Sequence, residues 1–239
     1  MIIAVIGNLR SGKTFIMTML AYISILFAYK QLSPKDMERL LNANEEISYN
    51  ENIPTEKTVI VKANYKIDVP NFEFFGIKEL LELVTLIEKG EPYDLHNCIL
   101  CLDEIVTILE SRVSGSVLSR LMSYFIMQSG KADVQLIYTS QLDSMADIRL
   151  RSLANITIRC RKNKVKQKFN YIWTTDTGHI KKFNLPLHKA KQFYYLYDTK
   201  QKIPLASIQI RNALNKAKQE QKEQELKEKR LERKLEKML

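Results

Sequence analysis

The sequence predicts an α/β fold with a mostly parallel central sheet, and three features support this prediction. Strands are predicted at residues 2–6, 59–65, 98–102, 134–141 and 155–160, of which 2–6 and 98–102 are uninterrupted apolar runs. Segments with apolar residues at helical spacing separate several of them, as strand–helix–strand crossovers require. The run at residues 98–102 shows no polar alternation, which is typical of a central parallel strand buried on both faces.

The first strand leads directly into a phosphate-binding sequence. Residues 7–14, GNLRSGKT, match the pattern G-x-x-x-x-G-K-[ST] without a mismatch. The two glycines permit a loop whose backbone N–H groups surround a phosphate, and the following helix points its N-terminus at the same anion. A chance match is the alternative, but the apolar segments on both sides argue for a P-loop. Its expected nucleotide-binding residues are Gly7, Asn8, Arg10, Ser11, Gly12, Lys13 and Thr14.

Two of these side chains have specific expected roles. The Lys13 ammonium is expected to contact the β- and γ-phosphates of ATP. The Thr14 hydroxyl is expected to bind Mg²⁺. The motif therefore predicts ATP and Mg²⁺ as the cofactors.

Helical segments are expected to connect the strands. The apolar run at residues 15–29 is shorter than the roughly 20 residues that span a bilayer, so we interpret it as the helix after the P-loop, with a membrane anchor as the alternative. Residues 76–88 have helical spacing up to Gly90 and predict a crossover helix. Weaker patterns predict helices at residues 35–43 and 116–127 and a mobile surface loop at residues 42–57.

Two acidic residues, Asp103 and Glu104, directly follow the central strand. Ligands of doubly wound sheets lie at the carboxyl ends of strands, where the P-loop also lies. We therefore expect Asp103 to hold Mg²⁺ and its water shell, and Glu104 to polarise the water that attacks ATP. A solvated acidic helix cap is the alternative, and the P-loop about ninety residues earlier favours the catalytic role.

The strand at residues 134–141 also ends in polar residues. Gln141 stands at its tip, where an amide can contact the γ-phosphate or the attacking water; a plain strand-end amide is the alternative. Arg149 or Arg151 could reach the nucleotide of a neighbouring subunit and stabilise the charge of the transition state. A phosphate-binding or surface arginine is the alternative for either of them.

The composition bounds the number of domains and the cellular setting. With 239 residues, 45% of them hydrophobic, the chain can bury one α/β core with a small appendage. Three cysteines fit a reducing compartment such as the cytoplasm, and Cys98 and Cys101 are expected to be buried on opposite faces of their strand. We expect no signal peptide, because an apolar strand begins at residue 2 with no basic region before it.

The net charge of +10 lies in the last third of the chain. Residues 1–150 hold 14 Lys and Arg against 19 Asp and Glu, residues 151–200 hold 12 against 2, and residues 201–239 hold 11 against 6. Such asymmetry indicates that an anionic polymer or a membrane surface contacts this part of the molecule.

The basic third contains a predicted hairpin and a predicted helix. Alternating aromatic residues around a turn at residues 176–178 predict an antiparallel hairpin over residues 161–185. Its basic first half suits nucleic-acid phosphates, with a solvated hairpin as the alternative. Residues 213–239 lack Gly and Pro and predict one charged helix, which frays or docks on a partner. The predicted parts are an ATPase core at 1–160, the basic hairpin with edge elements at 161–210 and a helical tail at 211–239.

Several segments together resemble a known family. The P-loop at residue 7, "VKANY" at 61–65, "LDE" at 102–104, "SGKADVQLIYTSQ" at 129–141 and "DIRLRSLA" at 147–154 are similar to the Zot-like and viral genome-packaging branch of the HerA/FtsK P-loop ATPases. The resemblance covers roughly residues 1–200. It implies a RecA-like fold, with Lys13, Thr14, Asp103, Glu104 and Gln141 at the Walker A, Walker B and strand-tip polar positions.

The resemblance also implies an activity and partners. Such ATPases assemble as a ring, commonly a hexamer, and move double-stranded DNA during virion packaging or phage export. The chain lacks the later apolar segment of membrane-bound Zot-like members, which favours a cytoplasmic packaging motor without membrane insertion. A capsid or other virion protein is a further expected partner. A soluble assembly ATPase acting on a protein is the alternative, and a nucleoside kinase is disfavoured because residues 110–150 show no lid motif.

Overall fold

The computed structural model describes residues 1–28, 59–76, 78–80, 82–83, 86, 90–91, 95, 97–105, 134–146, 148–198 and 201. All of them belong to one unit, Met1–Ile203. The predicted helices at residues 35–43, 116–127 and 213–239 and the predicted loop at residues 42–57 lie outside the described residues.

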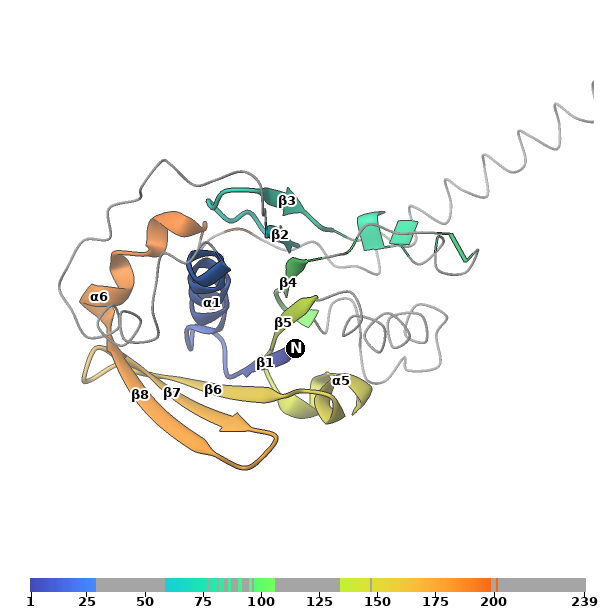
Figure 1. Ribbon diagram of the computed structural model, residues 1–239. Helices are drawn as coiled ribbons and strands as arrows, with labels where there is room; N and C mark the ends of the chain where they lie inside the picture. Colours follow the sequence, from blue (N-terminus) through green and yellow to red (C-terminus); the bar gives the residue numbers. More distant parts are fainter. Residues whose placement is uncertain are drawn as a thin grey trace, which may run out of the picture. The chain divides into compact units, whose positions relative to one another are not determined.

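The described elements are organised around one eight-stranded sheet of order β3-β2-β4-β5-β1-β6-β7-β8 (Figure 1). Pairing is parallel from β3 to β6 and antiparallel from β6 to β8. The predicted α/β class and mostly parallel sheet are therefore confirmed. The strands are β1 Ile2–Ile6, β2 Ile60–Ala63, β3 Phe72–Phe74, β4 Cys98–Leu102, β5 Gln135–Ser140, β6 Ile156–Asn163, β7 Lys168–Thr175 and β8 Ile180–Pro186.

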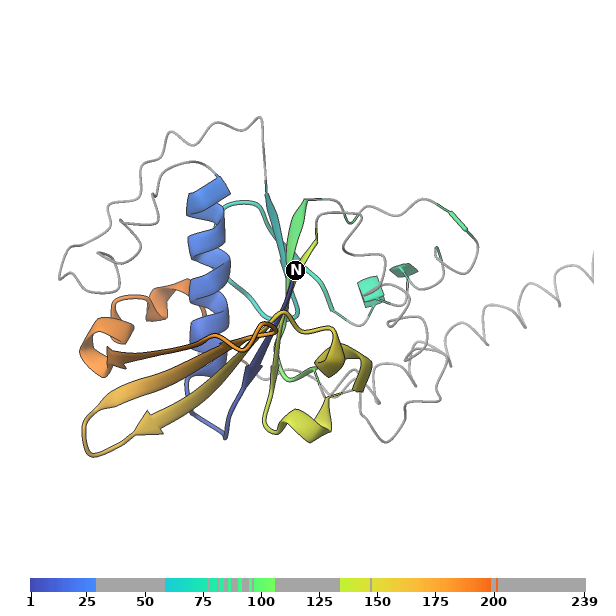
Figure 2. The same cartoon turned by 60° about the horizontal axis from the view of Figure 1, so that its bottom comes forward.

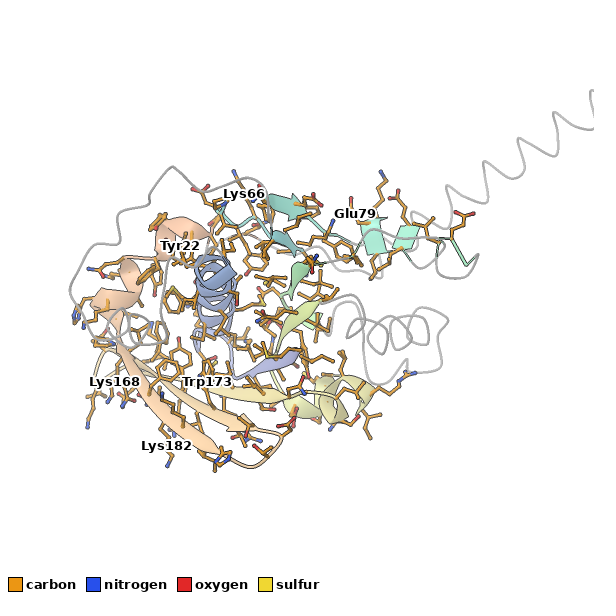
Figure 3. All side chains as sticks on the ribbon, in the orientation of Figure 1. Tyr22, Lys66, Glu79, Lys168, Trp173 and Lys182 are labelled. Atoms are coloured by element: carbon orange, nitrogen blue, oxygen red, sulfur yellow. The ribbon has the colours of Figure 1, made fainter. Side chains whose placement is uncertain are left out.

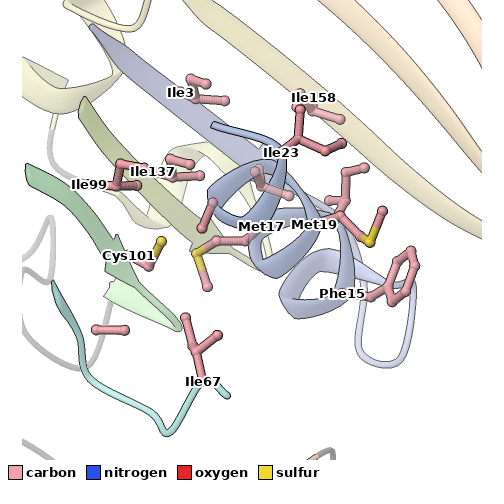
Figure 4. Packing of buried hydrophobic residues seen from close by; sticks show 14 of the residues in the cluster. Ile3, Phe15, Met17, Met19, Ile23, Ile67, Ile99, Cys101, Ile137 and Ile158 are labelled. Carbon is pink, nitrogen blue, oxygen red and sulfur yellow. The ribbon is translucent and has the colours of Figure 1, made fainter. Parts of the chain in front are cut away.

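The helix after the P-loop, α1 (Lys13–Ala28), covers one face of the sheet (Figure 2). Alternate strand residues such as Ile3, Ile99 and Ile137 point towards it and join its buried side chains in one cluster (Figure 4). Among the described residues, no helix is both long and apolar enough to cross a membrane.

The opposite face of the sheet has its own apolar cluster. The alternate residues of β1, Ile2, Ala4 and Ile6, pack there with Leu80 and Leu150. Leu80 belongs to the predicted crossover helix, of which residues 78–80, 82–83 and 86 are helical. Leu150 belongs to α5 (Ile148–Ser152), which follows the 3₁₀ helix η5 (Asp143–Met145).

The strand β4 is buried at every position, as predicted for a strand covered on both faces. Its cysteines contribute to different clusters, Cys101 on the α1 side and Cys98 on the other. Both cysteines are buried and neither forms a disulfide, which confirms that they are small core residues on opposite faces.

The predicted hairpin is formed by β7 and β8, and β6 pairs with β7 to extend the sheet by three antiparallel strands. The strand β6 runs from Ile156 to Asn163. It therefore continues across residues 160 and 161, where the ATPase core was predicted to end and the part with the basic hairpin to begin. The aromatic side chains of β7 and β8 face α1. They are Phe169, Tyr171, Trp173 and Phe183.

The chain then crosses α1 through α6 (Leu187–Lys191) and the 3₁₀ helix η6 (Tyr194–Leu196). Leu196 packs on Tyr22 and Leu26 of α1, and a β-bridge joins Tyr197 to Ile67. This crossing segment brings tyrosines close to the start of α1, since the rings of Tyr194 and Phe15 lie 5.8 Å apart.

Candidate nucleotide-binding site

The P-loop is closed by backbone hydrogen bonds at both ends. At its start, the Gly7 N–H donates to the Ser140 carbonyl at the end of β5, over 3.1 Å. Within the loop, the Ser11 N–H donates to the Asn8 carbonyl over 3.2 Å. At its end, the Ile16 N–H donates to the Gly12 carbonyl over 3.0 Å, so α1 begins inside the motif.

A side chain on either glycine of the motif would collide with neighbouring residues. A Cβ on Gly7 would lie 2.4 Å from the Cys160 carbonyl oxygen. Gly12 has a φ of +93°, and a Cβ there would lie 2.8 Å from both Phe169 and the Tyr171 hydroxyl. The loop therefore packs against β6 and β7 with no room for larger residues at these two positions.

Lys13 is buried, with 5% of its side chain exposed. Its Nζ donates to the Asn8 carbonyl over 3.3 Å and lies 3.5 Å from Glu104 Oε1. The ammonium is therefore held between the P-loop and Glu104, which lies two residues after the end of β4. A charged phosphate would find this cation already desolvated, which strengthens the attraction.

The two residues that were predicted to bind Mg²⁺, Thr14 and Asp103, lie in contact. The Thr14 hydroxyl lies 3.1 Å from Asp103 Oδ1 and 3.0 Å from Oδ2, and the Thr139 hydroxyl donates to Oδ1 over 2.6 Å. Burial raises the pKa of the Asp103 carboxyl above its ordinary value, while the hydrogen bonds from Thr139 and Thr14 oppose that effect. The carboxylate is thus partly desolvated, and its hydrogen-bond partners among the described residues are hydroxyls.

These donors fit Mg²⁺. Hydroxyl and carboxylate oxygens are its preferred ligands, and it keeps several waters and substrate phosphates rather than a full protein cage. The described residues contain no group of three or more His, Cys, Asp and Glu suited to a metal, so any ion here depends on phosphate and water for its remaining ligands.

Two residues that sequence reasoning missed hold Asp103 in place. The Asn64 side chain accepts from the Asp103 N–H over 2.8 Å and donates to the Asp103 carbonyl over 2.9 Å. Thr139 bonds Asp103 as described and also accepts from the Glu104 N–H over 2.8 Å. Asn64 directly follows β2, just as Asp103 directly follows β4. A polar residue in this place after a neighbouring strand was the sequence signal that could have identified Asn64.

Six of the predicted site residues line a cavity of about 390 Å³. Its size is within the range of small-ligand sites. The predicted residues that line it are Arg10, Gly12, Lys13, Thr14, Asp103 and Glu104. Aromatic residues complete the wall, namely Phe15, Tyr65, Phe169, Tyr194 and Tyr197.

The other predicted residues lie outside this cavity. Gly7, Asn8 and Ser11 line a neighbouring cavity that is described below. Gln141 is half-buried just after β5, and Thr139 of the same strand contacts Asp103. Arg149 and Arg151 lie on α5, where the Arg151 Nε donates to the Ala146 carbonyl over 3.1 Å. Within one chain, neither arginine lines the cavity that holds Lys13.

Comparisons with known proteins show the fold. The N-terminal domain of zonular occludens toxin from Neisseria meningitidis superposes with a TM-score of 0.50 at 15% identity, over 82% of this chain and 98% of that one. The genome packaging NTPase B204 from Sulfolobus turreted icosahedral virus 2, in complex with ATP-gammaS, gives a TM-score of 0.44 at 12% identity, over 77% and 97%. No family model and no curated protein matches the sequence. The chain thus has a P-loop NTPase fold.

Proposed function

We propose that the protein is a Mg²⁺-dependent ATPase. The observation that carries this proposal is the meeting of the Thr14 hydroxyl and the Asp103 carboxylate, 3.0–3.1 Å apart, beside the buried Lys13 ammonium in one cavity. Bound Mg²⁺ would supply positive charge to the phosphates. The chain's own residues hold the ion at Thr14 and Asp103 and the phosphates at Lys13 and the loop N–H groups.

Glu104 is the proposed general base. Its φ of +49° and the hydrogen bond from its N–H to Thr139 fix its backbone. In the ligand-free protein its carboxylate is 3.5 Å from Lys13 Nζ. When a triphosphate takes Lys13 as its partner, the Glu104 carboxylate becomes available to accept a proton from the attacking water.

We further propose that ATP turnover moves double-stranded DNA through a ring of copies, as in viral genome packaging. Two features support this step. The basic charge is concentrated after residue 150, as an anionic polymer partner requires. Arg149 and Arg151 lie outside the chain's own cavity, and we propose that in a ring one of them contacts the nucleotide of a neighbouring subunit.

The direct test is ATP turnover by the wild-type chain and by Glu104→Gln. The variant is expected to bind ATP normally and to hydrolyse it at least about 10²-fold more slowly, because only proton transfer is removed. Glu91→Gln, at an exposed glutamate, is the control and should leave turnover unchanged. Near-normal turnover in Glu104→Gln would remove Glu104 from the mechanism.

DNA dependence separates the motor from an ATPase that acts on a protein. Linear duplex DNA should stimulate ATP hydrolysis by the wild-type chain. Hydrolysis that is unaffected by duplex DNA would leave the ATPase proposal standing and reject DNA translocation.

A further inference from the structure

A second cavity, of about 630 Å³, adjoins the candidate nucleotide-binding site. The two cavities share Leu9, Arg10 and Lys162 as lining residues. The remaining wall comes from the first half of the P-loop and from the end of β6 with the turn after it. Five basic residues line this second cavity, and none of the described residues around it is acidic; they are Arg10, Arg159, Arg161, Lys162 and Lys164.

A buried donor also lines this cavity. Ser11 is 4% exposed, and its hydroxyl oxygen has no hydrogen-bond partner among the residues that the structure describes. A buried polar group without a partner costs stability unless a ligand or water satisfies it. A hydroxyl surrounded by cationic side chains is suited to donate to an oxygen of an anion, so this cavity has the chemistry of a phosphate site.

The basic surface continues from the cavity onto the sheet. Along β6, Ile158 and Cys160 are buried, whereas Arg159 and Arg161 are exposed, so the two arginines share the face that points away from α1. The antiparallel register places Arg159 opposite Ile172 and Ile172 opposite Lys182. It also aligns Arg161 with Asn170 and Asn184.

We call this surface the outer face, and define it by Arg159, Arg161, Asn170, Ile172, Lys182 and Asn184. Figure 3 shows Lys182 pointing away from the side of the sheet where Trp173 lies. The strands β6, β7 and β8 contain no Asp or Glu. The outer face has three cationic side chains, Arg159, Arg161 and Lys182. None of them is paired with an acidic residue that the structure describes. The face is therefore an uncompensated positive surface.

We infer that the outer face and the adjoining cavity bind the phosphate backbone of nucleic acid. Only one part of this inference rests on the proposed function, namely that the nucleic acid is double-stranded DNA. Strand geometry separates Arg159 from Arg161 by about 7 Å and from Lys182 by about 10 Å, so the cations are spread over several successive phosphates rather than gathered on one ion. Arginine pairs with phosphate through two parallel hydrogen bonds, and asparagine amides donate to phosphate or sugar oxygens.

The composition of the face favours DNA over a membrane. Two large apolar side chains lie on this side of β7 and β8, Ile172 at 36% and Ile180 at 64% exposed, and an interfacial membrane site needs a larger apolar surface to enter the lipid. The face also offers no array of base-reading side chains on a helix, so contacts to the backbone, independent of base sequence, are expected.

The test is the salt dependence of duplex-DNA binding by the full-length chain. Each phosphate contact that is removed should reduce the slope of log K against log salt by about 0.9. Arg159→Gln, Arg161→Gln and Lys182→Ala are each expected to show this reduction. Lys181→Ala is the matched control, because Lys181 is the neighbouring exposed lysine on β8 but pairs with Trp173, on the opposite face.

Nucleotide binding serves as the measure of correct folding, since none of these four residues lines the candidate nucleotide-binding cavity. If the wild-type chain binds DNA and the Arg159, Arg161 and Lys182 variants keep its slope, the assignment of this face is wrong while DNA binding stands. If Lys181→Ala reduces the slope of log K against log salt as much as Lys182→Ala does, the assignment of this face is also wrong. If the wild-type chain does not bind DNA, or binds vesicles with anionic lipid more tightly than DNA, both the face and the DNA motor are rejected.

Discussion

The structure predicts that Asn64 is essential to the site although it touches no ligand. Its side-chain amide makes a paired contact with the backbone of Asp103, accepting from the N–H over 2.8 Å and donating to the carbonyl over 2.9 Å. Asn64 is 5% exposed and Asp103 is 8% exposed, so water has little access to these groups. Asn64→Ala would remove both partners at once.

The expected cost follows from the two backbone groups that are left without partners. Each buried group without a hydrogen bond costs about 1–3 kcal/mol, so the free energy of unfolding should fall by about 2–6 kcal/mol. For a chain of this size, that corresponds to a decrease of about 4–24 °C in the melting temperature. Turnover of ATP should fall by about 10²-fold, because Asp103 is no longer fixed and a displacement near 1 Å has that effect.

Urea unfolding and steady-state ATP hydrolysis measure the two effects. Asn163→Ala is the control, since Asn163 accepts one exposed backbone hydrogen bond from Lys166 and its removal should cost under about 0.5 kcal/mol. The reasoning is refuted if Asn64→Ala unfolds within about 0.5 kcal/mol of the wild-type chain, or if its turnover is normal.

Two further predictions concern the loop and the assembly. Gly12→Ala should destabilise the protein by more than Gly178→Ala and abolish nucleotide binding. Both glycines have a positive φ, +93° and +83°, but only at Gly12 would the added Cβ meet neighbours, 2.8 Å away; equal melting temperatures would contradict this. If Arg149 or Arg151 acts across subunits, ATPase activity should rise more than linearly with protein concentration. Lys13→Ala should then partly restore turnover when mixed with Arg149→Ala or Arg151→Ala, and no mixture rescues if the site is complete in one chain.

The parallel part of the fold was predictable because its signals are local. Apolar runs without alternation mark β1 and β4, and both are buried at every position. The P-loop motif then fixed where α1 begins. By contrast, β3 is a three-residue edge strand whose burial alternation is incomplete, so its sequence offered no strand signal of sufficient length.

The candidate site was predictable only for residues that lie next to a recognisable pattern. Thr14 and Asp103 were expected to share an ion, and their side chains lie in contact. The prediction for β5 named Gln141 as a contact of the γ-phosphate or the attacking water, whereas the contact from β5 to Asp103, made by Thr139, was not predicted. The reason is register: Leu102 pairs with Tyr138, which brings the next residue of each strand together, and a single sequence does not reveal register between strands.

The aromatic wall of the cavity could not be predicted because it depends on long-range packing. Tyr194 and Tyr197 reach the start of α1 only because the chain after β8 turns back across that helix, where Leu196 contacts Tyr22. The hairpin itself was expected from its alternating aromatic residues, whereas its position beside the P-loop was not. Tyr171 of β7 illustrates the consequence, since its hydroxyl donates to the Gly12 carbonyl over 3.4 Å.

The geometry around Asp103 links stability to ligand binding. A carboxyl whose pKa is raised by burial favours the protonated form in the folded state, so at neutral pH its charge opposes folding of the ligand-free protein. The hydroxyls of Thr14 and Thr139 offset that cost only in part, because neither of them carries a positive charge. A divalent cation beside Asp103 would remove the imbalance, and it would do so only in the folded state. Nucleotide with Mg²⁺ should therefore stabilise the fold more than nucleotide alone, and this additional stabilisation should disappear in Asp103→Asn.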